Sequence, residues 1–209
     1  MSELQTKEWD GKPADKSSED FLHPAPTQTD SKGSLFGYTL LALALALFIR
    51  FFVAAPYVVS GASMEPNFHN WDYLITDRVS YRMSEPARGD VIVFHLPQEY
   101  SRTLIKRVIG LPGETVVVEG TTVRVSDGEN TMILDESYLS EMNLGGPTNV
   151  SVSLGQDEYF VMGDNRRVSS DSRTWGALPR DHIVGRVLLR LFPFTSLGFL
   201  PAEARYLEE

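Results

Sequence analysis

The sequence predicts a mainly β domain, of curved sandwich or barrel type, that follows a single transmembrane helix. Two observations carry this prediction. One apolar segment, 35–59, lies early in the chain, and short β-branched or aromatic runs separated by Pro and Gly follow it. No long amphipathic helix pattern occurs between those runs. With 209 residues, the chain can hold one domain of ordinary size and an appendage.

Residues 1–34 are polar, mixed in charge and punctuated by prolines and glycines. Because they lack apolar periodicity, we expect a disordered cytoplasmic segment there. The segment 35–59 begins LFGYTLLALALALFI and has no polar face at helical spacing. About 20 apolar residues span a bilayer, so we expect a transmembrane anchor, with a buried core helix as the alternative.

Arg50 interrupts this apolar segment. An arginine inside hydrocarbon costs ~2.5–3.5 kcal/mol, so the span can end near it. Lys16 and Lys32 precede the segment, whereas no Lys or Arg follows Arg50 until Arg78. The positive-inside rule therefore predicts a single-pass protein of the cell membrane, with a cytoplasmic N-terminus and an extracytoplasmic domain at 60–209.

Ten short runs within the second part of the chain predict strands, and LPGE and SDGEN between them supply turn residues. The runs are 57–61, 72–79, 89–96, 103–110, 114–120, 121–126, 131–134, 149–154, 158–163 and 185–192.

The composition excludes several classes of protein. A formal charge of −9 without a basic stripe argues against a nucleic-acid binder, because phosphate contacts need clustered Lys and Arg. The sequence has no Cys, which excludes disulfides, thiolate nucleophiles and Cys-based metal sites. Four scattered His without an HExxH pattern argue against a zinc protease. We expect no metal or organic cofactor.

Ser63 is the first candidate for chemistry. It lies in SGASMEP, where small residues precede it and Pro66 follows. Such an open loop can present both a hydroxyl and a backbone N–H, which an acyl-transfer nucleophile and its oxyanion hole require. A turn-forming serine without a chemical role is the alternative.

Lys106 is the second candidate, because after Arg50 the chain contains thirteen Arg and this single Lys. Strand geometry places it on one face with Leu104 and Val108, and places Arg107 on the other face. Burial among apolar side chains can lower a lysine pKa from about 10.4 to about 8, so that the neutral amine acts as a base. A lysine that snorkels to water is the alternative.

A third cluster, 162–173, is dense in Asp, Arg and Ser and can form a charge network that fixes nearby side chains. Taken in order after one anchor, the segments SGASMEP, RGDVIVF, LIKRVIGLPGE and GDNRRVSSDSR resemble the signature boxes of bacterial type I signal peptidases. The resemblance extends from about Tyr57 to the C-terminal RLFPFTSLGFL, and residues 1–34 lie outside it.

The resemblance implies a β-rich catalytic domain with a Ser–Lys dyad. Ser63 would attack the scissile carbonyl, neutral Lys106 would take its proton, and Ser169 would orient the lysine amine. The Ser63 backbone N–H would hold the oxyanion. The remaining matched positions would be structural, with Asp171 paired to Arg173 and Arg107, and with Asp164 and Arg166 in a similar supporting role.

The chain departs from the family pattern in two ways. Some members carry a serine two positions before the nucleophile, whose hydroxyl helps to bind the oxyanion, but this chain has Gly61, as do members that use backbone groups. After Pro66 the family usually shows Thr and an aliphatic residue, whereas this chain has Asn67 and Phe68. The second departure concerns the packing around the nucleophile.

The resemblance also implies the partners. The substrates would be exported preproteins, cut after small residues at sites of the Ala-x-Ala type, by a monomer attached to the lipid bilayer. Aromatic side chains favour the membrane interface, and we expect such a rim near the anchor. The candidates are Phe192, Phe194, Phe199 and Trp175.

Three other functions compete with this interpretation. A Ser-His-Asp hydrolase would use His69, His95 or His182, none of which lies in a recognisable catalytic context. An anchored binding module without activity would lack Ser63 or Lys106, and both are present. Self-cleaving regulators of the repressor type share similar boxes, but they are soluble and carry a DNA-binding segment.

Overall fold

The computed structural model describes residues 31–48, 50, 53–146, 149–202 and 204. The predicted segment 1–34 therefore lies mostly outside the described residues. Helix α1 covers Ser31–Phe48, and the first strand of the sheet, β1, covers Ala54–Val58. The predicted anchor at 35–59 is thus wrong in its bounds: the helix begins earlier, and the last apolar residues belong to a strand.

The reason for this correction lies in the pairing of β1 with β2 (Tyr73–Asp77), where Ala54 lies opposite Asp77 and Val58 opposite Tyr73. Pro56 cannot donate to a ladder, and β1 is an edge strand of its sheet, where Pro is tolerated. Ala54–Val58 continues the apolar run without a charged residue, so the sequence pattern did not separate the helix from the strand.

Helix α1 exposes the side chains of 35–48. Its polar Thr39 is satisfied within the helix, because Thr39 Oγ1 donates to Leu35 O at 2.9 Å. No helix among the described residues is both long and apolar enough to cross a membrane.

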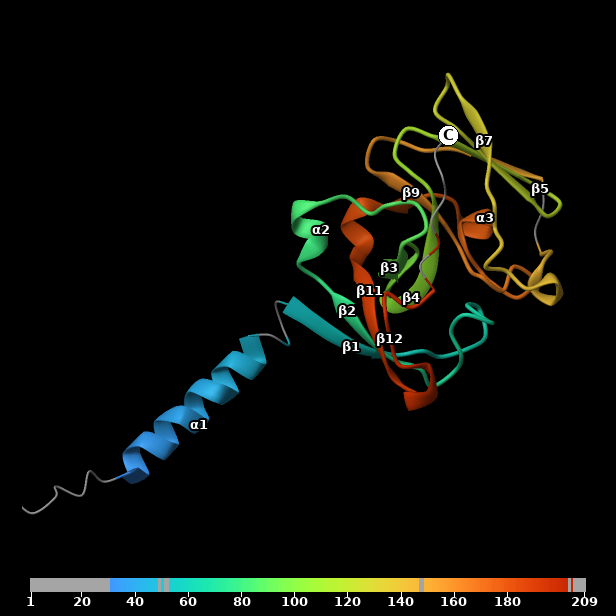
Figure 1. Ribbon diagram of the computed structural model, residues 1–209. Helices are drawn as coiled ribbons and strands as arrows, with labels where there is room; N and C mark the ends of the chain where they lie inside the picture. Colours follow the sequence, from blue (N-terminus) through green and yellow to red (C-terminus); the bar gives the residue numbers. More distant parts are fainter. Residues whose placement is uncertain (1–30, 49, 51–52, 147–148, 203, 205–209) are drawn as a thin grey trace, which may run out of the picture. The chain divides into compact units, whose positions relative to one another are not determined.

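A mainly β domain follows, as predicted (Figure 1). Its larger sheet is antiparallel and has the strand order β1-β2-β11-β3-β4-β9-β10, with β12 paired to β11. The remaining strands of this sheet are β3 (Val91–Leu96), β4 (Glu99–Gly110), β9 (Glu158–Met162), β10 (Leu178–Pro179), β11 (Ile183–Phe192) and β12 (Gly198–Phe199).

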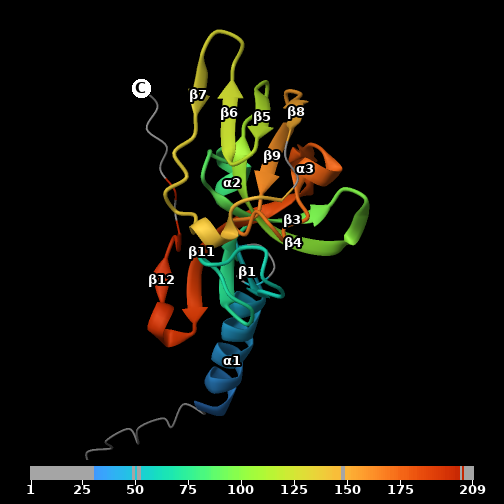
Figure 2. The same cartoon turned by 90° about the vertical axis from the view of Figure 1, so that its right-hand side faces the viewer.

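The smaller sheet has four antiparallel strands in the order β7-β6-β5-β8, which lie side by side in Figure 2. They are β5 (Thr115–Glu119), β6 (Thr122–Ser126), β7 (Thr131–Ile133) and β8 (Val150–Ser153). Short helical turns connect the strands: α2 (Ser80–Met83), α3 (Ser172–Trp175), η2 (Glu141–Asn143), η3 (Arg180–His182) and η4 (Phe194–Ser196).

Strand β3 lies at the centre of the larger sheet and is buried on both faces. Val91 and Val93 pack into a core cluster with the Ser63 loop, while Ile92 and Phe94 pack into a second cluster on the other side. This alternation is the period-2 geometry of a strand. All ten predicted runs overlap strands, because β-branched residues fit a pleated surface that is buried.

Candidate functional site

Ser63 lies in the loop 59–72, which connects β1 to β2. The two ends of this loop are tied to each other: Val59 N–H donates to Asp72 O at 2.9 Å, and Trp71 N–H donates to Val59 O at 2.9 Å. Side chains from the loop then fill the core beneath it. Met64 is 1% exposed and Phe68 is 0% exposed, so the backbone around Ser63 cannot move without opening the core.

The same loop is held from three other segments of the chain. Asn67 Nδ2 donates to Asp164 Oδ2 at 2.8 Å and to Tyr138 O at 3.2 Å. Arg190 of β11 donates to Asn67 O at 2.7 Å, and its guanidinium lies 4.8 Å from the centre of the Phe68 ring. Asn67 and Phe68, which differ from the residues usual in the family, therefore both help to fasten the loop.

Gly61, two residues before Ser63, has φ +97°, in the region that favours glycine. Its N–H donates to Asn70 Oδ1 at 3.0 Å. Gly61 thus shapes the turn that leads into Ser63.

Lys106 extends from β4 to Ser63. Lys106 Nζ lies 2.6 Å from Ser63 Oγ and donates to Ile105 O at 2.8 Å. The side chain is 2% exposed. Two residues that are 43 positions apart in the sequence thus share a hydrogen bond in a nearly dry environment.

Burial lowers the pKa of Lys106 from 10.5 to about 8, because desolvation disfavours the charged ammonium. The carboxylates of Asp171 and Asp164 act in the opposite direction and raise this pKa. Burial outweighs them, so a substantial fraction of the amine is neutral near pH 8 and can accept a proton.

Ser169 lies beside the dyad, behind Gly163. A Cβ placed on Gly163 would meet Ser169 Oγ at 2.3 Å and Ser63 O at 2.4 Å, so only glycine permits this approach. Ser169 Oγ is buried and has no hydrogen-bond partner among the described residues. The hydroxyl is therefore placed near Ser63 without a bond to Lys106, and buried hydroxyls of this kind call for an explanation.

Arg107 pairs with Asp164 through two hydrogen bonds. Arg107 Nε and Nη2 donate to the two oxygens of Asp164 at 2.9 and 2.6 Å, and both side chains are 0% exposed. The register of β4 against β9 explains this pairing, because Arg107 lies opposite Met162, two residues before Asp164. The guanidinium also lies 4.1 Å from the centre of the Tyr138 ring.

Asp171 is occupied by Arg173, whose Nε and Nη2 donate to it at 2.8 and 2.9 Å. Asp171 also accepts the Gly163 N–H at 3.0 Å, which fixes the glycine behind Ser63. Arg166 forms a third buried pair through its Nη1, which donates to Glu136 at 2.6 Å, and its Nε donates to Gly163 O at 3.0 Å. These pairs hold the loop that carries Ser169.

A cavity of about 190 Å³ opens over Ser63 and Lys106. It is lined by residues 57–60 from the end of β1 and the loop after it, by Thr103–Lys106 of β4, and by the apolar side chains of Leu74 and Val93. Neither His69 nor His95 nor His182 lines it. The described residues therefore give Ser63 a lysine as its neighbour and no histidine base.

This arrangement, a serine hydroxyl on a buried amine in a mostly apolar cavity, suits a serine hydrolase that acts on acyl groups. Comparison with known proteins agrees. The family model described as "Signal peptidase, peptidase S26" matches residues 33–192. The chain belongs to this family, and it is a serine endopeptidase that removes signal peptides.

The chain is similar to several curated signal peptidases. A probable signal peptidase I-1 of Synechocystis sp. is 42% identical over 168 residues, which are 77% of this chain and 83% of that protein. Signal peptidase I of Leptolyngbya laminosa is 41% identical, and the match covers 79% of this chain and 82% of that protein. Signal peptidase I of Bacillus licheniformis is 35% identical, and the match covers 81% of this chain and 95% of that protein.

Sequence reasoning gave no role to several residues that build this site. Gly163 and Asn67 were visible in the matched segments, but the need for glycine and the reach of the amide depend on neighbours from distant segments. Glu136 and Tyr138 lie outside the boxes, in a connection without a pattern. Only the fold places them against Arg166 and Arg107.

Removal of the Arg107 side chain tests the buried pair. We expect Arg107→Ala to lower the free energy of unfolding by about 3–5 kcal/mol, because Asp164 remains as an uncompensated buried charge. Arg124→Ala is the matched control: its ion pair with Glu119 has side chains 40% and 54% exposed, and exposed pairs contribute at most about 1 kcal/mol. Urea unfolding measures both. Equal losses for the two variants would contradict the assignment.

Proposed function

We propose that Ser63 is the nucleophile and Lys106 the general base of this peptidase. The observation that carries the proposal is the distance of 2.6 Å between Lys106 Nζ and Ser63 Oγ. The lowered pKa of Lys106 supports it, because only a neutral amine can take the hydroxyl proton. Arg could not replace this lysine, since a guanidinium keeps its proton.

The reaction proceeds in two halves. Ser63 Oγ attacks the scissile carbonyl carbon while its proton moves to Lys106 Nζ, and the ammonium then gives that proton to the leaving amine as the C–N bond breaks. In the second half, Lys106 Nζ takes a proton from water, the hydroxide attacks the acyl carbon, and the ammonium returns the proton to Ser63 Oγ as the ester C–O bond breaks. The Ser63 N–H, which donates to no described group, binds the oxyanion.

Ser169 acts as a positioning residue for Lys106 in this proposal. Its buried, unpaired Oγ and its place beside Gly163 support this role. A small rotation of the hydroxyl or the amine, upon binding of substrate, would bring the two groups together, since catalytic hydrogen bonds often tighten only in the complex. Asp164, Arg166, Asp171 and Arg173 serve as scaffold.

The cavity over Ser63 supports a substrate with small side chains. Its lining comes partly from β1 and β4, and an extended peptide laid along them would place a side chain against the apolar part of that lining. Preproteins with Ala-x-Ala sites place small apolar side chains there.

The direct test is cleavage of a purified preprotein with an Ala-x-Ala site, in detergent or lipid. We expect the native enzyme to cut after the second Ala and Ser63→Ala to leave the substrate intact, because among the hydroxyls that line the cavity only Ser63 Oγ is hydrogen-bonded to Lys106 Nζ. Ser60→Ala, a neighbouring serine of the same cavity, is the control and keeps activity. Cleavage by Ser63→Ala would refute the assignment.

The pH dependence of kcat/KM tests the base. With the pKa of Lys106 at about 8, the neutral fraction rises with pH, so kcat/KM should climb through a midpoint near pH 8 and then level off. At pH 6 it should be about one hundredth of the plateau. A flat profile from pH 6 to 10 would contradict a neutral amine as the base.

Two variants belong to the same measurement. Lys106→Arg should be inactive at every pH. Ser169→Ala should lower kcat at least tenfold and shift the midpoint, with little change in KM or in the melting temperature, because the lost hydroxyl has no structural partner. Ser170→Ala, at the adjacent exposed position, is the control. A shared loss of stability and activity in Ser169→Ala would indicate a purely structural role.

We further propose that the apolar N-terminal helix attaches the enzyme to the cell membrane, in a single pass with a cytoplasmic N-terminus and an extracytoplasmic catalytic domain, acting as a monomer. The exposed apolar side chains at 35–48 support attachment. Phe192, Phe194 and Phe199 are 49, 80 and 68% exposed and suit the interface. Trp175 does not belong to this rim, because it packs against Phe94 with ring centres 5.9 Å apart.

Protease accessibility tests this topology. In intact cells stripped of their wall, external protease should degrade the catalytic domain, and alkaline carbonate should leave the full chain in the membrane fraction. A chain lacking residues 1–48 is the control and should be released. Complete protection of the catalytic domain, with lysis restoring its cleavage, would contradict the proposed orientation.

A further inference from the structure

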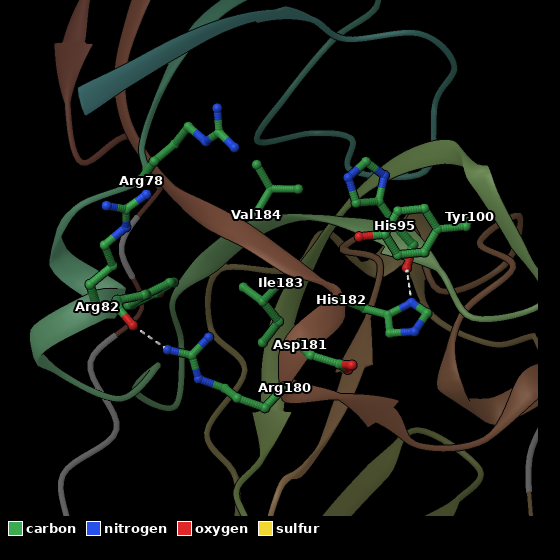
Figure 3. A pocket seen from close by; sticks show the side chains of 10 residues that line it. Arg78, Arg82, His95, Tyr100, Arg180, Asp181, His182, Ile183 and Val184 are labelled. Carbon is green, nitrogen blue, oxygen red and sulfur yellow. Dashed lines mark hydrogen bonds between the residues drawn. The ribbon is translucent and has the colours of Figure 1, made fainter. Parts of the chain in front are cut away.

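A second cavity, of about 260 Å³, shares no residue with the cavity over Ser63. Figure 3 shows three arginines along one side of it and three rings along the other. The arginines come from separate elements: Arg78 follows β2, Arg82 belongs to α2, and Arg180 belongs to η3. We call this cavity the arginine pocket.

The charge of the arginine pocket contrasts with that of the chain. Three arginines and a single carboxylate, Asp181, line it, whereas the whole protein has a formal charge of −9. Arg180 is held in place, since its Nε donates to Glu85 at 2.9 Å and its Nη2 donates to Tyr81 O. Arg82 is exposed, and its backbone N–H donates to Val79 O at 2.9 Å at the start of α2.

The other wall is aromatic. Tyr100 stacks on His95 with ring centres 4.4 Å apart and meets His182 edge-on at 5.3 Å. His182 Nδ1 is bonded to His95 O at 3.0 Å, which fixes the ring (Figure 3). Tyr100 itself is 61% exposed, so one face of the wall is open to a flat or apolar group of a ligand.

The way this protein uses arginine elsewhere identifies the ligand chemistry. Each buried carboxylate of the catalytic scaffold takes one guanidinium: Asp164 takes Arg107, Asp171 takes Arg173 and Glu136 takes Arg166. Arg180 is paired with Glu85, but three guanidinium groups around one cavity together offer more N–H donors than one carboxylate ligand needs. A phosphate group has more oxygens and more charge, and the planar fork of arginine matches it.

We propose that the arginine pocket binds a phosphate ester, with Arg78, Arg82 and Arg180 around the phosphate and Tyr100 against the organic part. The volume of about 260 Å³ is several times the ~30 Å³ share of one water molecule, which leaves room for an organic group beside the phosphate. The source is either a lipid headgroup, which is a phosphodiester, or a soluble phosphate monoester.

Calorimetric titration of the full chain in detergent tests the proposal with two soluble probes. Glycerol 3-phosphate represents a monoester, and glycerophosphoglycerol represents the diester of a lipid headgroup. We expect saturable binding at one site for at least one of them. Arg82→Gln should weaken it at least tenfold without affecting cleavage of the preprotein, because Arg82 is exposed and lies outside the Ser63 cavity.

The controls separate a site from general charge effects. Arg124→Gln makes the same change of charge on β6, outside the arginine pocket, and should bind as the native protein does. Tyr100→Ala should weaken the esters but not inorganic phosphate. Tighter binding of the diester would assign the pocket to lipid, and tighter binding of the monoester to a soluble ligand.

Three outcomes would overturn the proposal. Neither ester binds with saturation; or Arg124→Gln weakens binding as much as Arg82→Gln does; or glutarate, a dicarboxylate, binds as tightly as the better ester. The last result would indicate an acidic peptide as the ligand.

Discussion

The buried ion pair between Arg107 and Asp164 is the interaction on which the site depends. Arg107 follows Lys106 directly on β4, and Asp164 follows Gly163 directly after β9. Asp164 also accepts from Asn67 of the nucleophile loop at 2.8 Å. One carboxylate therefore joins the strand that carries the amine, the loop that carries Ser169 and the loop that carries Ser63. Such a pair costs desolvation, but its two-point geometry fixes orientation as packing alone does not.

The same network sets the electrostatics of the amine. Burial favours neutral Lys106, while Asp164 and Asp171 favour the ammonium. Each of these carboxylates is neutralised by an arginine partner, so their effect on Lys106 is reduced and burial dominates. A scaffold of matched Asp and Arg thus serves two purposes, because it holds the loops and also leaves the lysine free to lose its proton near pH 8.

The arginine side chains near the two cavities of the domain are paired differently. In the scaffold beside Ser63, Arg107, Arg166 and Arg173 each pair with a buried carboxylate, and the cavity over Ser63 is lined mostly by apolar side chains. In the arginine pocket, the cations exceed the carboxylates and face a cavity. A peptide substrate and a phosphate ester require these opposite environments. The scissile peptide bond needs a cleft that excludes water, and the phosphate ester needs positive charge that is accessible to solvent.

The sequence by itself determined the β class and the ten strand-forming runs, and it singled out Ser63 and Lys106 as the candidates for the proposed dyad, because β-branched alternation and short motifs are local properties. It could not determine where the helix ends, since Ala54–Val58 is as apolar as α1 and becomes a strand only through its pairing with β2. Nor could it identify Asp164 as the partner of Arg107, because the register of β4 against β9 decides which carboxylate lies within hydrogen-bond distance of the guanidinium. The approach of Ser169 to Ser63 behind Gly163 and the clustering of three arginines around one cavity were likewise decided by the tertiary structure, which alone brings residues from separate strands and loops into contact.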